Sequence, residues 1–324
     1  MTDTASGLDL PDGSLRPVYQ FLCALFVVTR RHGVALAAMM RLFRASPYTV
    51  SHQGFALFGE SGAGKSSTLR HFKAQLRQAL GLSETDPDPL PCISVTATMT
   101  PKDLMVELLK ACGDPVPASG TRAELIARFK VLAPHVTAIR GIALDEAHHA
   151  FEAKNGKDKV QMALTLKDVV SAFPKPIIAM GPMVLEQYLD AADGMPMRFE
   201  RREFLEDMRL DLADDMYDLR AVLKAMDEAL PSEPGWSLVS PEMVKRLYLA
   251  GRASFGRIVT LVQRACLHGL MNGAERVGQA HYSAAWLEVA PRRQRSDKYD
   301  PFKLDIATVH ALANQLSSKL RERE

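Results

Sequence analysis

The chain has 324 residues, of which 47% are hydrophobic and 24% charged, and its formal net charge is +2. This length supports a sizeable core in more than one domain, and the near-neutral balance neither demands nor excludes nucleic acid as a partner. Four scattered cysteines with no C-x-x-C pair argue against a disulfide framework or a zinc knuckle. The apolar stretch FLCALFVV is too short to span a bilayer and lacks the features of a signal peptide, so we expect a cytoplasmic protein.

Strands and helices are predicted to alternate along the first two thirds of the chain. The expected helices cover residues 15–44, 65–80, 100–113, 121–133 and 157–172. The expected strands cover residues 47–59, 92–97, 139–149, 175–181 and 201–207. The helix at 100–113 begins with Thr100 and Asp103, which have the spacing of a capping box. Strands that alternate with helices indicate a parallel sheet covered by helices on both faces.

The remainder of the chain is predicted to be helical. No further strand is evident after about residue 208, and helical patterns cover residues 212–230, 240–250, 254–273 and 283–290. The last twenty residues are expected to form one more amphipathic helix. The sequence therefore predicts an N-terminal helical segment (1–50), an α/β core (51–207), a helical lid (208–290) and a basic linker with a C-terminal tail (291–324).

The stretch GESGAGKSS at residues 59–67 lies between a predicted strand and a predicted helix and contains the spacing G-x-x-x-x-G-K-[S/T]. Glycines permit the conformations and close approaches by which backbone N–H groups surround phosphate oxygens. Lys65 would place a positive charge on the β- and γ-phosphates of ATP, and the Ser66 hydroxyl would ligate Mg²⁺. The residues predicted to bind the nucleotide are Gly59, Glu60, Ser61, Gly62, Ala63, Gly64, Lys65, Ser66 and Ser67.

A second part of this site is predicted at the end of the strand in GIALDEAHH. Asp145 is expected to hold Mg²⁺ together with Ser66, and Glu146 to act as the general base towards the attacking water. His148 and His149 follow directly. Because adjacent residues of a helix face different ways and no third ligand has metal-site spacing, a structural or solvent-facing role is favoured for both histidines.

Four stretches resemble AAA+ ATPases in their order and spacing, and in particular the TniB/TnsC group of transposition ATPases; the likeness to MuB and the origin-recognition ATPases is more distant. The stretches are GESGAGKSSTLRHF, PCISVTATMTPKDLMVELLKACGDP, GIALDEAHHAF and PIIAMGPMVLEQYL. The resemblance extends from roughly residue 35 to residue 275. It implies a P-loop NTPase (AAA+) fold, with a parallel sheet flanked by helices and a C-terminal helical lid.

The resemblance also implies two roles for arginines. Arg198 lies where the family places the arginine finger that reaches a neighbouring subunit's nucleotide, although Arg201 and Arg202 are close competitors. Arg257 matches the lid arginine that senses the γ-phosphate. Solvated surface arginines are the alternative at each position.

One position departs from the family's pattern. After the fourth strand, AAA+ proteins usually carry a polar sensor residue, but this chain has Gly181, Pro182 and Met183. None of these side chains can orient a water molecule. We therefore expect slow intrinsic hydrolysis of ATP to ADP and phosphate.

The family resemblance implies ATP-dependent assembly on duplex DNA, with little dependence on DNA sequence, as a homo-oligomeric ring or helical filament. The assembly would recruit or activate a transposase, with a TniQ-like targeting protein as a possible further partner and no membrane involved. The candidate DNA contacts, for which an ordinary solvated face is the alternative, are Thr98, Thr100, Lys102, Lys154 and Lys157, with Lys159 beside them. A further basic cluster in the tail, able to touch DNA or a partner protein, comprises Arg292, Arg293, Arg295 and Lys298.

Two other functions remain open at this point. One is an ATPase that acts on protein partners, such as a secretion ATPase of the ExeA type or a signalling switch. The other is an ATPase similar to replication initiators or helicase loaders. A small-molecule kinase is disfavoured, because no acceptor pocket is evident and the Asp-Glu pair suits hydrolysis better.

Overall fold

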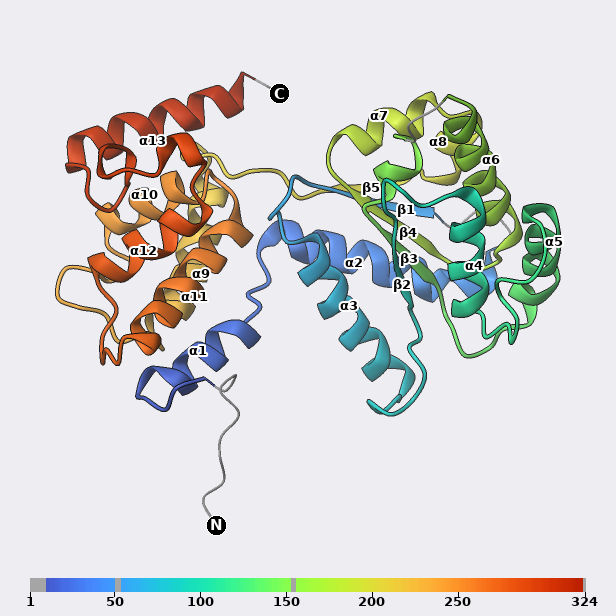
Figure 1. The fold of residues 1–324 in the computed structure, drawn as a ribbon, viewed down its shortest axis with the longest axis horizontal. Coiled ribbons are helices and arrows are strands. Elements are labelled where there is room, and N and C mark those ends of the chain that lie inside the picture. Colours follow the sequence, from blue (N-terminus) through green and yellow to red (C-terminus); the bar gives the residue numbers. More distant parts are fainter. Residues whose placement is uncertain (1–9, 50–53, 153–155, 323–324) are drawn as a thin grey trace, which may run out of the picture. The chain divides into compact units, whose positions relative to one another are not determined.

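The computed structural model describes residues 10–49, 54–152 and 156–322, which fall into two compact units (Figure 1). The core unit comprises Arg31–Glu206, and the helical unit comprises Met1–Arg30 together with Asp207–Glu324. The predicted N-terminal segment 1–50 is thus divided, since residues up to Arg30 group with the helical unit and the following residues with the core unit.

The core unit contains a five-stranded parallel sheet. Its strands are β1 (Gly54–Phe58), β2 (Cys92–Ser94), β3 (Ile142–Asp145), β4 (Ile177–Gly181) and β5 (Arg201–Phe204). Their order across the sheet is β2-β3-β4-β1-β5, and every neighbouring pair is parallel. The predicted parallel α/β sheet is therefore confirmed, with each strand shorter than the stretch that predicted it.

Helices cover both faces of this sheet. They are α2 (Arg30–Ala45), α3 (Lys65–Leu80), α4 (Pro101–Ala111), α5 (Arg122–Leu132), α6 (Gly156–Ala172), α7 (Val184–Ala191) and α8 (Met195–Arg198). In Figure 1, α2 and α3 lie on one side of the sheet and α4, α5 and α6 on the other. Successive strand residues face opposite sides, so Ala56 and Phe58 join the core beneath α4–α7. All five residues of β1 are buried, which explains its continuous apolar sequence.

The single helix predicted over residues 15–44 is wrong, because the chain forms α1 (Leu15–Ala24) and then α2. Leu25 is extended, with φ −65° and ψ 125°, and the β-branched residues Val27, Val28 and Thr29 follow it in the connection. The Arg30 N–H then donates a hydrogen bond of 3.0 Å to Asp218 at the start of α2. Apolar periodicity alone did not reveal this interruption.

The helical unit is built from α1 and five further long helices. These are α9 (Ala213–Asp227), α10 (Pro241–Ala250), α11 (Phe255–Met271), α12 (Gln279–Val289) and α13 (Ile306–Arg321). Leu15 and Leu22 of α1 share the apolar core of this unit. The helix predicted at the C-terminus is confirmed as α13. The predicted tail is packed, because Phe302 and Ala313 are buried in the same core.

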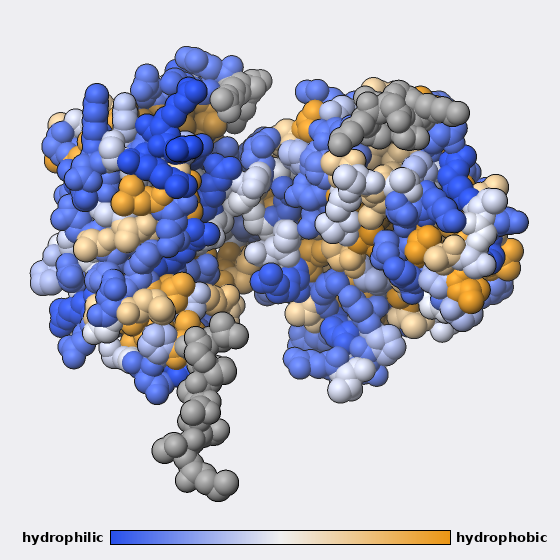
Figure 2. All heavy atoms as spheres, viewed as in Figure 1, coloured by the Kyte–Doolittle hydropathy of each residue, from blue (hydrophilic) through white to orange (hydrophobic). Residues whose placement is uncertain are grey.

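The surface of the described residues is mixed in polarity. The face of the molecule in Figure 2 is mainly hydrophilic, with smaller hydrophobic areas between the polar ones. Such scattered apolar exposure is ordinary for folded proteins. None of the helices described combines the length and apolar character that crossing a membrane would require.

Phe302 offers a test of the packed tail. Its side chain is 1% exposed and its ring lies 5.3 Å from that of Tyr282, so Phe302→Ala should destabilise the helical unit by about 3–5 kcal/mol. Both tryptophans of the chain, Trp236 and Trp286, belong to this unit, so tryptophan fluorescence during urea unfolding reports on it alone. The matched control is Tyr299→Ala, since Tyr299 is 46% exposed and should contribute less than about 0.5 kcal/mol. Equal midpoints for the two variants would contradict the packed position of the tail.

Candidate functional site

The glycine loop connects the end of β1 to the start of α3. Gly62 and Gly64 have φ values of 88° and 94°, a left-handed conformation that favours glycine. A Cβ at Gly59 would lie 2.7 Å from the Leu205 carbonyl oxygen, so this glycine permits a close backbone approach. The loop ends at Gly64, directly before the N-terminus of α3, whose free N–H groups and dipole favour an anion.

The Lys65 amine lies inside the loop. Its Nζ donates hydrogen bonds to the carbonyl oxygens of Gly59 (2.5 Å) and Glu60 (3.3 Å), and the residue is buried. Burial lowers the pKa of Lys65, and the nearby carboxylates of Glu146 and Asp145 partly oppose this shift. A bound phosphate could therefore take the place of these two carbonyl oxygens and form an ion pair with the Lys65 ammonium.

Ser66 and Asp145 meet at the carboxyl edge of the sheet. The Ser66 Oγ donates a hydrogen bond of 3.2 Å to Asp145 Oδ2, although the residues are 79 positions apart. Ser66 comes from the first turn of α3 and Asp145 from the last position of β3. A hydroxyl and a carboxylate are the hard oxygen ligands that Mg²⁺ prefers, so this pair fits the predicted magnesium site.

Glu146 has an unusual backbone conformation directly after β3. Its φ of 52° and ψ of 37° place a non-glycine residue in the left-handed region, at a cost of about 1–2 kcal/mol. Its N–H donates a hydrogen bond of 2.9 Å to Asp145 Oδ1. The side chain is 45% exposed, so the predicted general base is accessible to water.

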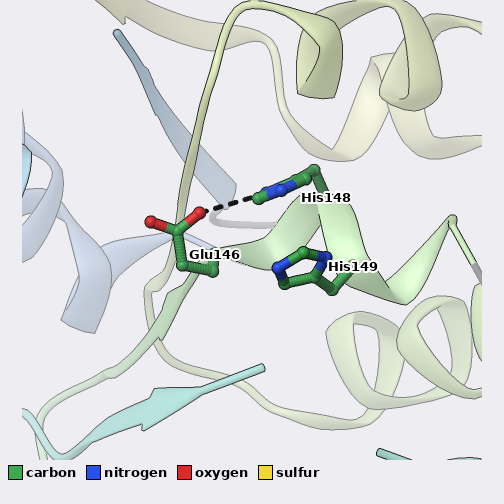
Figure 3. Close-up of side chains that lie close together, drawn as sticks. All are labelled: Glu146, His148 and His149. Carbon is green, nitrogen blue, oxygen red and sulfur yellow. Dashed lines mark ion pairs between the residues drawn. The ribbon is translucent and has the colours of Figure 1, made fainter. Parts of the chain in front are cut away.

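The two histidines after Glu146 converge, contrary to the expected divergence of adjacent residues (Figure 3). They lie on a 3-10 turn, η3 (Ala147–Ala150), and their ring centroids are 4.0 Å apart. Ligand atoms of Glu146, His148 and His149 all lie within 4.8 Å of one another, although His149 Nδ1 already forms a hydrogen bond of 3.0 Å with Glu152. The premise that the two histidines face different ways is therefore wrong, because the backbone is not α-helical here, and the structural or solvent-facing role favoured for them stays a prediction.

His32 of α2 packs against the glycine loop at Gly64, although no sequence motif predicts it. The side chain is buried, and a Cβ at Gly64 would lie 2.8 Å from its Nε2. Burial is the main cause that lowers the pKa of His32. No motif marks this residue, and only the apolar pattern of α2 places it on a buried face.

The three arginines considered for the finger differ in their contacts. Arg198 donates to the Gly194 carbonyl oxygen (2.6 Å) and to Ser171 Oγ (3.0 Å), so its guanidinium is engaged within the core unit. Arg202 is paired with Asp190 at 2.7 Å. Arg201 pairs with β1 through its backbone, but its side chain is exposed and forms no hydrogen bond or ion pair with the part of the chain that the structure describes. The assignment of the finger to Arg198 stays a prediction, and the contacts favour Arg201.

The remaining predicted residues belong to the helical unit, to the start of α4 or to residues outside the description. Arg257 is exposed on α11 of the helical unit, and its sensing role stays a prediction. Thr98 and Lys102 are exposed near the start of α4, but the Thr100 hydroxyl is engaged with the Asp103 carboxylate at 2.7 Å, which also confirms the capping box. Lys154 lies outside the described residues. Lys157 and Lys159 belong to α6 by their backbone, and their side chains are also outside the description.

Comparisons with known proteins agree with this architecture. Residues 50–189 match the sequence family described as "AAA domain". The chain is similar to the ORC1 protein of Aeropyrum pernix, solved in complex with DNA, with a TM-score of 0.59, 17% identity, and coverage of 95% of this chain and 87% of that one. It is similar to Cdc6p of Pyrobaculum aerophilum, with a TM-score of 0.59, 13% identity, and coverage of 96% and 85%.

A third structure, the ORC2 protein of Aeropyrum pernix in ADPNP–ADP complexes, has a TM-score of 0.56 and 13% identity, with coverage of 87% of this chain and 70% of that one. No curated protein matches the sequence. At these identities the likeness shows the fold alone. The predicted AAA+ P-loop NTPase fold is thereby confirmed.

The backbone at Glu146 generates a stability prediction. Glu146→Gly and Glu146→Ala both remove the carboxylate, but only glycine adopts a φ of 52° freely, so the glycine variant should be more stable by about 1 kcal/mol. Urea unfolding followed by circular dichroism measures the difference. The control pair replaces Glu107, in the interior of α4, where alanine should be the more stable residue by about 1 kcal/mol. The same sign at both positions would show that Glu146 is not left-handed in solution.

Proposed function

We propose that this protein is an ATPase that binds ATP and Mg²⁺ at the glycine loop and hydrolyses ATP to ADP and phosphate. The contact of Ser66 Oγ with Asp145 Oδ2, beside the Lys65 amine, is the observation that carries this proposal. It supports the proposal because two segments distant in sequence bring a hydroxyl, a carboxylate and an ammonium to one loop.

In this proposal, each residue of the nucleotide site has a defined role. The loop N–H groups and Lys65 bind the β- and γ-phosphate oxygens and orient the γ-phosphate. Glu146 accepts a proton from the water whose oxygen attacks the γ-phosphorus, while the bond to the bridging oxygen of ADP breaks. Magnesium bound by Ser66 and Asp145 would neutralise part of the phosphate charge.

The proposal extends to duplex DNA. The similar ORC1 protein was solved in complex with DNA, as was Drosophila ORC, which has a TM-score of 0.53 and 13% identity over all of this chain and 89% of that one. Exposed Thr98 and Lys102 near the start of α4 supply groups suited to phosphate contact. In this proposal the protein assembles on DNA in the cytoplasm, as a homo-oligomer in which ATP joins neighbouring subunits.

We favour regulation of transposition as the role of this assembly, with a transposase and a TniQ-like protein as partners, on the motif resemblance described above. The second candidate is an initiator-like or helicase-loader-like role. It is favoured by the similarity to ORC1 and Cdc6p over at least 95% of the chain. The two roles differ in DNA recognition, since a filament on arbitrary target DNA contacts phosphates while an initiator also reads bases.

Two substitutions separate nucleotide binding from hydrolysis. Lys65→Ala should abolish measurable binding of a fluorescent ATP analogue, because it removes the ammonium from the phosphate loop. Glu146→Gln should bind the analogue as the wild type does but lower kcat by about 10²–10⁴-fold, because the amide cannot accept the proton. Lys110→Ala is the control, since Lys110 is an exposed lysine paired with Glu107. Full turnover by Glu146→Gln would exclude Glu146 as the base.

Binding to DNA is tested by fluorescence anisotropy of a random-sequence duplex with ATP, with ADP and without nucleotide. Binding should require ATP and be lost in Lys65→Ala. If six or more phosphates are contacted, the affinity should fall by about 10³-fold or more between 50 and 200 mM salt. Lys102→Ala should reduce the slope of log affinity against log salt by about one if Lys102 contacts a phosphate, whereas Lys110→Ala on the same helix should leave it unchanged.

Three outcomes of this measurement, repeated with duplexes of unrelated sequence, decide between the proposals. Equal affinity for unrelated duplexes supports assembly on arbitrary DNA, while a strong preference for one sequence supports the initiator-like role. If no nucleotide state binds DNA at low salt, the DNA proposal fails and an ATPase acting on protein partners takes its place.

A further inference from the structure

His148 lies beside the proposed general base but has no part in the proposed mechanism so far. The residue is only 8% exposed, on the turn η3 that follows Glu146. Its Nδ1 is 3.3 Å from Glu146 Oε2, the contact drawn in Figure 3. This nitrogen is buried and forms no hydrogen bond of regular geometry within the described part of the chain. A buried polar atom without a partner costs about 1–3 kcal/mol, so its position needs an explanation.

The end of β4 leaves space for this imidazole. A Cβ at Gly181 would lie 3.4 Å from His148 Nδ1 and 3.0 Å from Leu185 Cδ2. Gly181 is paired in register with Phe58, and its carbonyl oxygen accepts a hydrogen bond of 3.1 Å from the Gly59 N–H. His148 Nδ1 therefore lies where a longer side chain at position 181 would extend. This position is next to the start of the glycine loop.

The surroundings of His148 favour the neutral imidazole. Burial is the first cause that lowers its pKa, and the His149 ring and the Lys65 ammonium lower it further. The carboxylates of Glu146 and Glu152 oppose this shift. A neutral imidazole carries one N–H, and its other nitrogen can only accept. His148 Nδ1 lies 3.3 Å from Glu146 Oε2, whereas Nε2 lies 3.8 Å from Glu152 Oε2. The shorter contact favours the tautomer that carries its proton on Nδ1.

We propose that His148 is a positioning residue, whose Nδ1–H holds the Glu146 carboxylate in the orientation that accepts the proton of the attacking water. The inference rests on the proposed ATPase function. His148 thus supplies, from the turn after β3, a polar group that the end of β4 lacks at Gly181. Within the described residues, the half-exposed Glu146 carboxylate has no hydrogen bond or ion pair besides this contact with His148. The absence of a polar side chain at Gly181 is therefore not sufficient reason to expect slow hydrolysis of ATP.

The first test compares the kcat of ATP hydrolysis in His148→Ala with that in His148→Asn. Alanine removes the donor and should lower kcat by about 10–100-fold while leaving the affinity for ATP within about twofold. Asparagine can place an amide N–H close to the position of Nδ1 and should retain most of the activity. Asparagine as harmful as alanine, or alanine without effect, would overturn the proposal.

His149→Ala is the matched control. His149 has the same chemistry and lies one position further along the chain, but its Nδ1 is already hydrogen-bonded to Glu152. It should therefore leave kcat within about twofold of the wild type. Equal losses in both alanine variants would indicate that the histidines act as one unit, as in a transition-metal site, and would also overturn the proposal.

Restoring a polar group at the end of β4 gives an independent check. Gly181→Asn in the His148→Ala background should recover part of the lost kcat, because removal of the imidazole frees the neighbouring space. Gly181→Ala in the same background is the control for the added Cβ and should recover nothing. Equal recovery by the two would contradict a positioning role for the polar group.

Nuclear magnetic resonance of the imidazole nitrogens separates this inference from the proposed function. The wild type should show a neutral His148 protonated at Nδ1 at pH 7, and Glu146→Ala should shift the population towards the Nε2–H tautomer. An Nε2–H tautomer in the wild type overturns the inference even if ATP is hydrolysed. A wild type that hydrolyses ATP no faster than Lys65→Ala instead overturns the proposed ATPase, whatever the tautomer.

Discussion

The whole candidate site depends on the strand order of a parallel sheet. Because all five strands run the same way, the residues that follow them meet at one edge, and β4 lies between β1 and β3. The phosphate loop follows β1, while Asp145 ends β3 and Glu146 follows it, so the hydrogen bond from Ser66 to Asp145 passes the end of the intervening strand. That strand ends in Gly181, which brings backbone but no side chain to the centre of the site.

Local backbone geometry then determines where the acidic side chain points. The left-handed conformation of Glu146 ends β3 abruptly and starts the tight turn η3, on which His148 is buried. Without this turn, the imidazole would not lie against both Glu146 and Gly181. The strain of about 1–2 kcal/mol at Glu146 is thus linked to the arrangement of the base and of the histidine that contacts it.

Much of the core unit could be predicted from the sequence, because its signals are local. The apolar runs of β1 and β4, the glycine loop and the cap at Thr100 each involve a few neighbouring residues. Other features depend on distant contacts. The break between α1 and α2 follows from an extended Leu25, and residues up to Arg30 join a unit formed by the far end of the chain.

The histidine pair shows a different limit. The expectation that the two side chains diverge assumed α-helical geometry, whereas η3 is a short 3-10 turn in which Ala147 and Ala150 are buried. The arginines illustrate the same limit, since spacing could not tell which guanidinium is already engaged. Arg198 is held by Gly194 and Ser171, and Arg202 by Asp190.

The segment around β5 connects these contacts to the proposed assembly. An arginine that reaches a neighbouring subunit must leave its own subunit's hydrogen bonds, and breaking charged hydrogen bonds costs about 1.5–3 kcal/mol each. The Arg201 guanidinium has no such cost, because its side chain is exposed at the start of the edge strand β5 and has no hydrogen bond or ion pair within the described residues. Met197, an apolar side chain that is 75% exposed, lies on the preceding short helix. Subunit interfaces combine buried apolar side chains with charged contacts. Met197 could supply the first and the unpaired guanidinium of Arg201 the second. If the proposed homo-oligomer forms, these properties favour the segment from Met197 to Arg201 as the part of the core unit that would contact the next subunit.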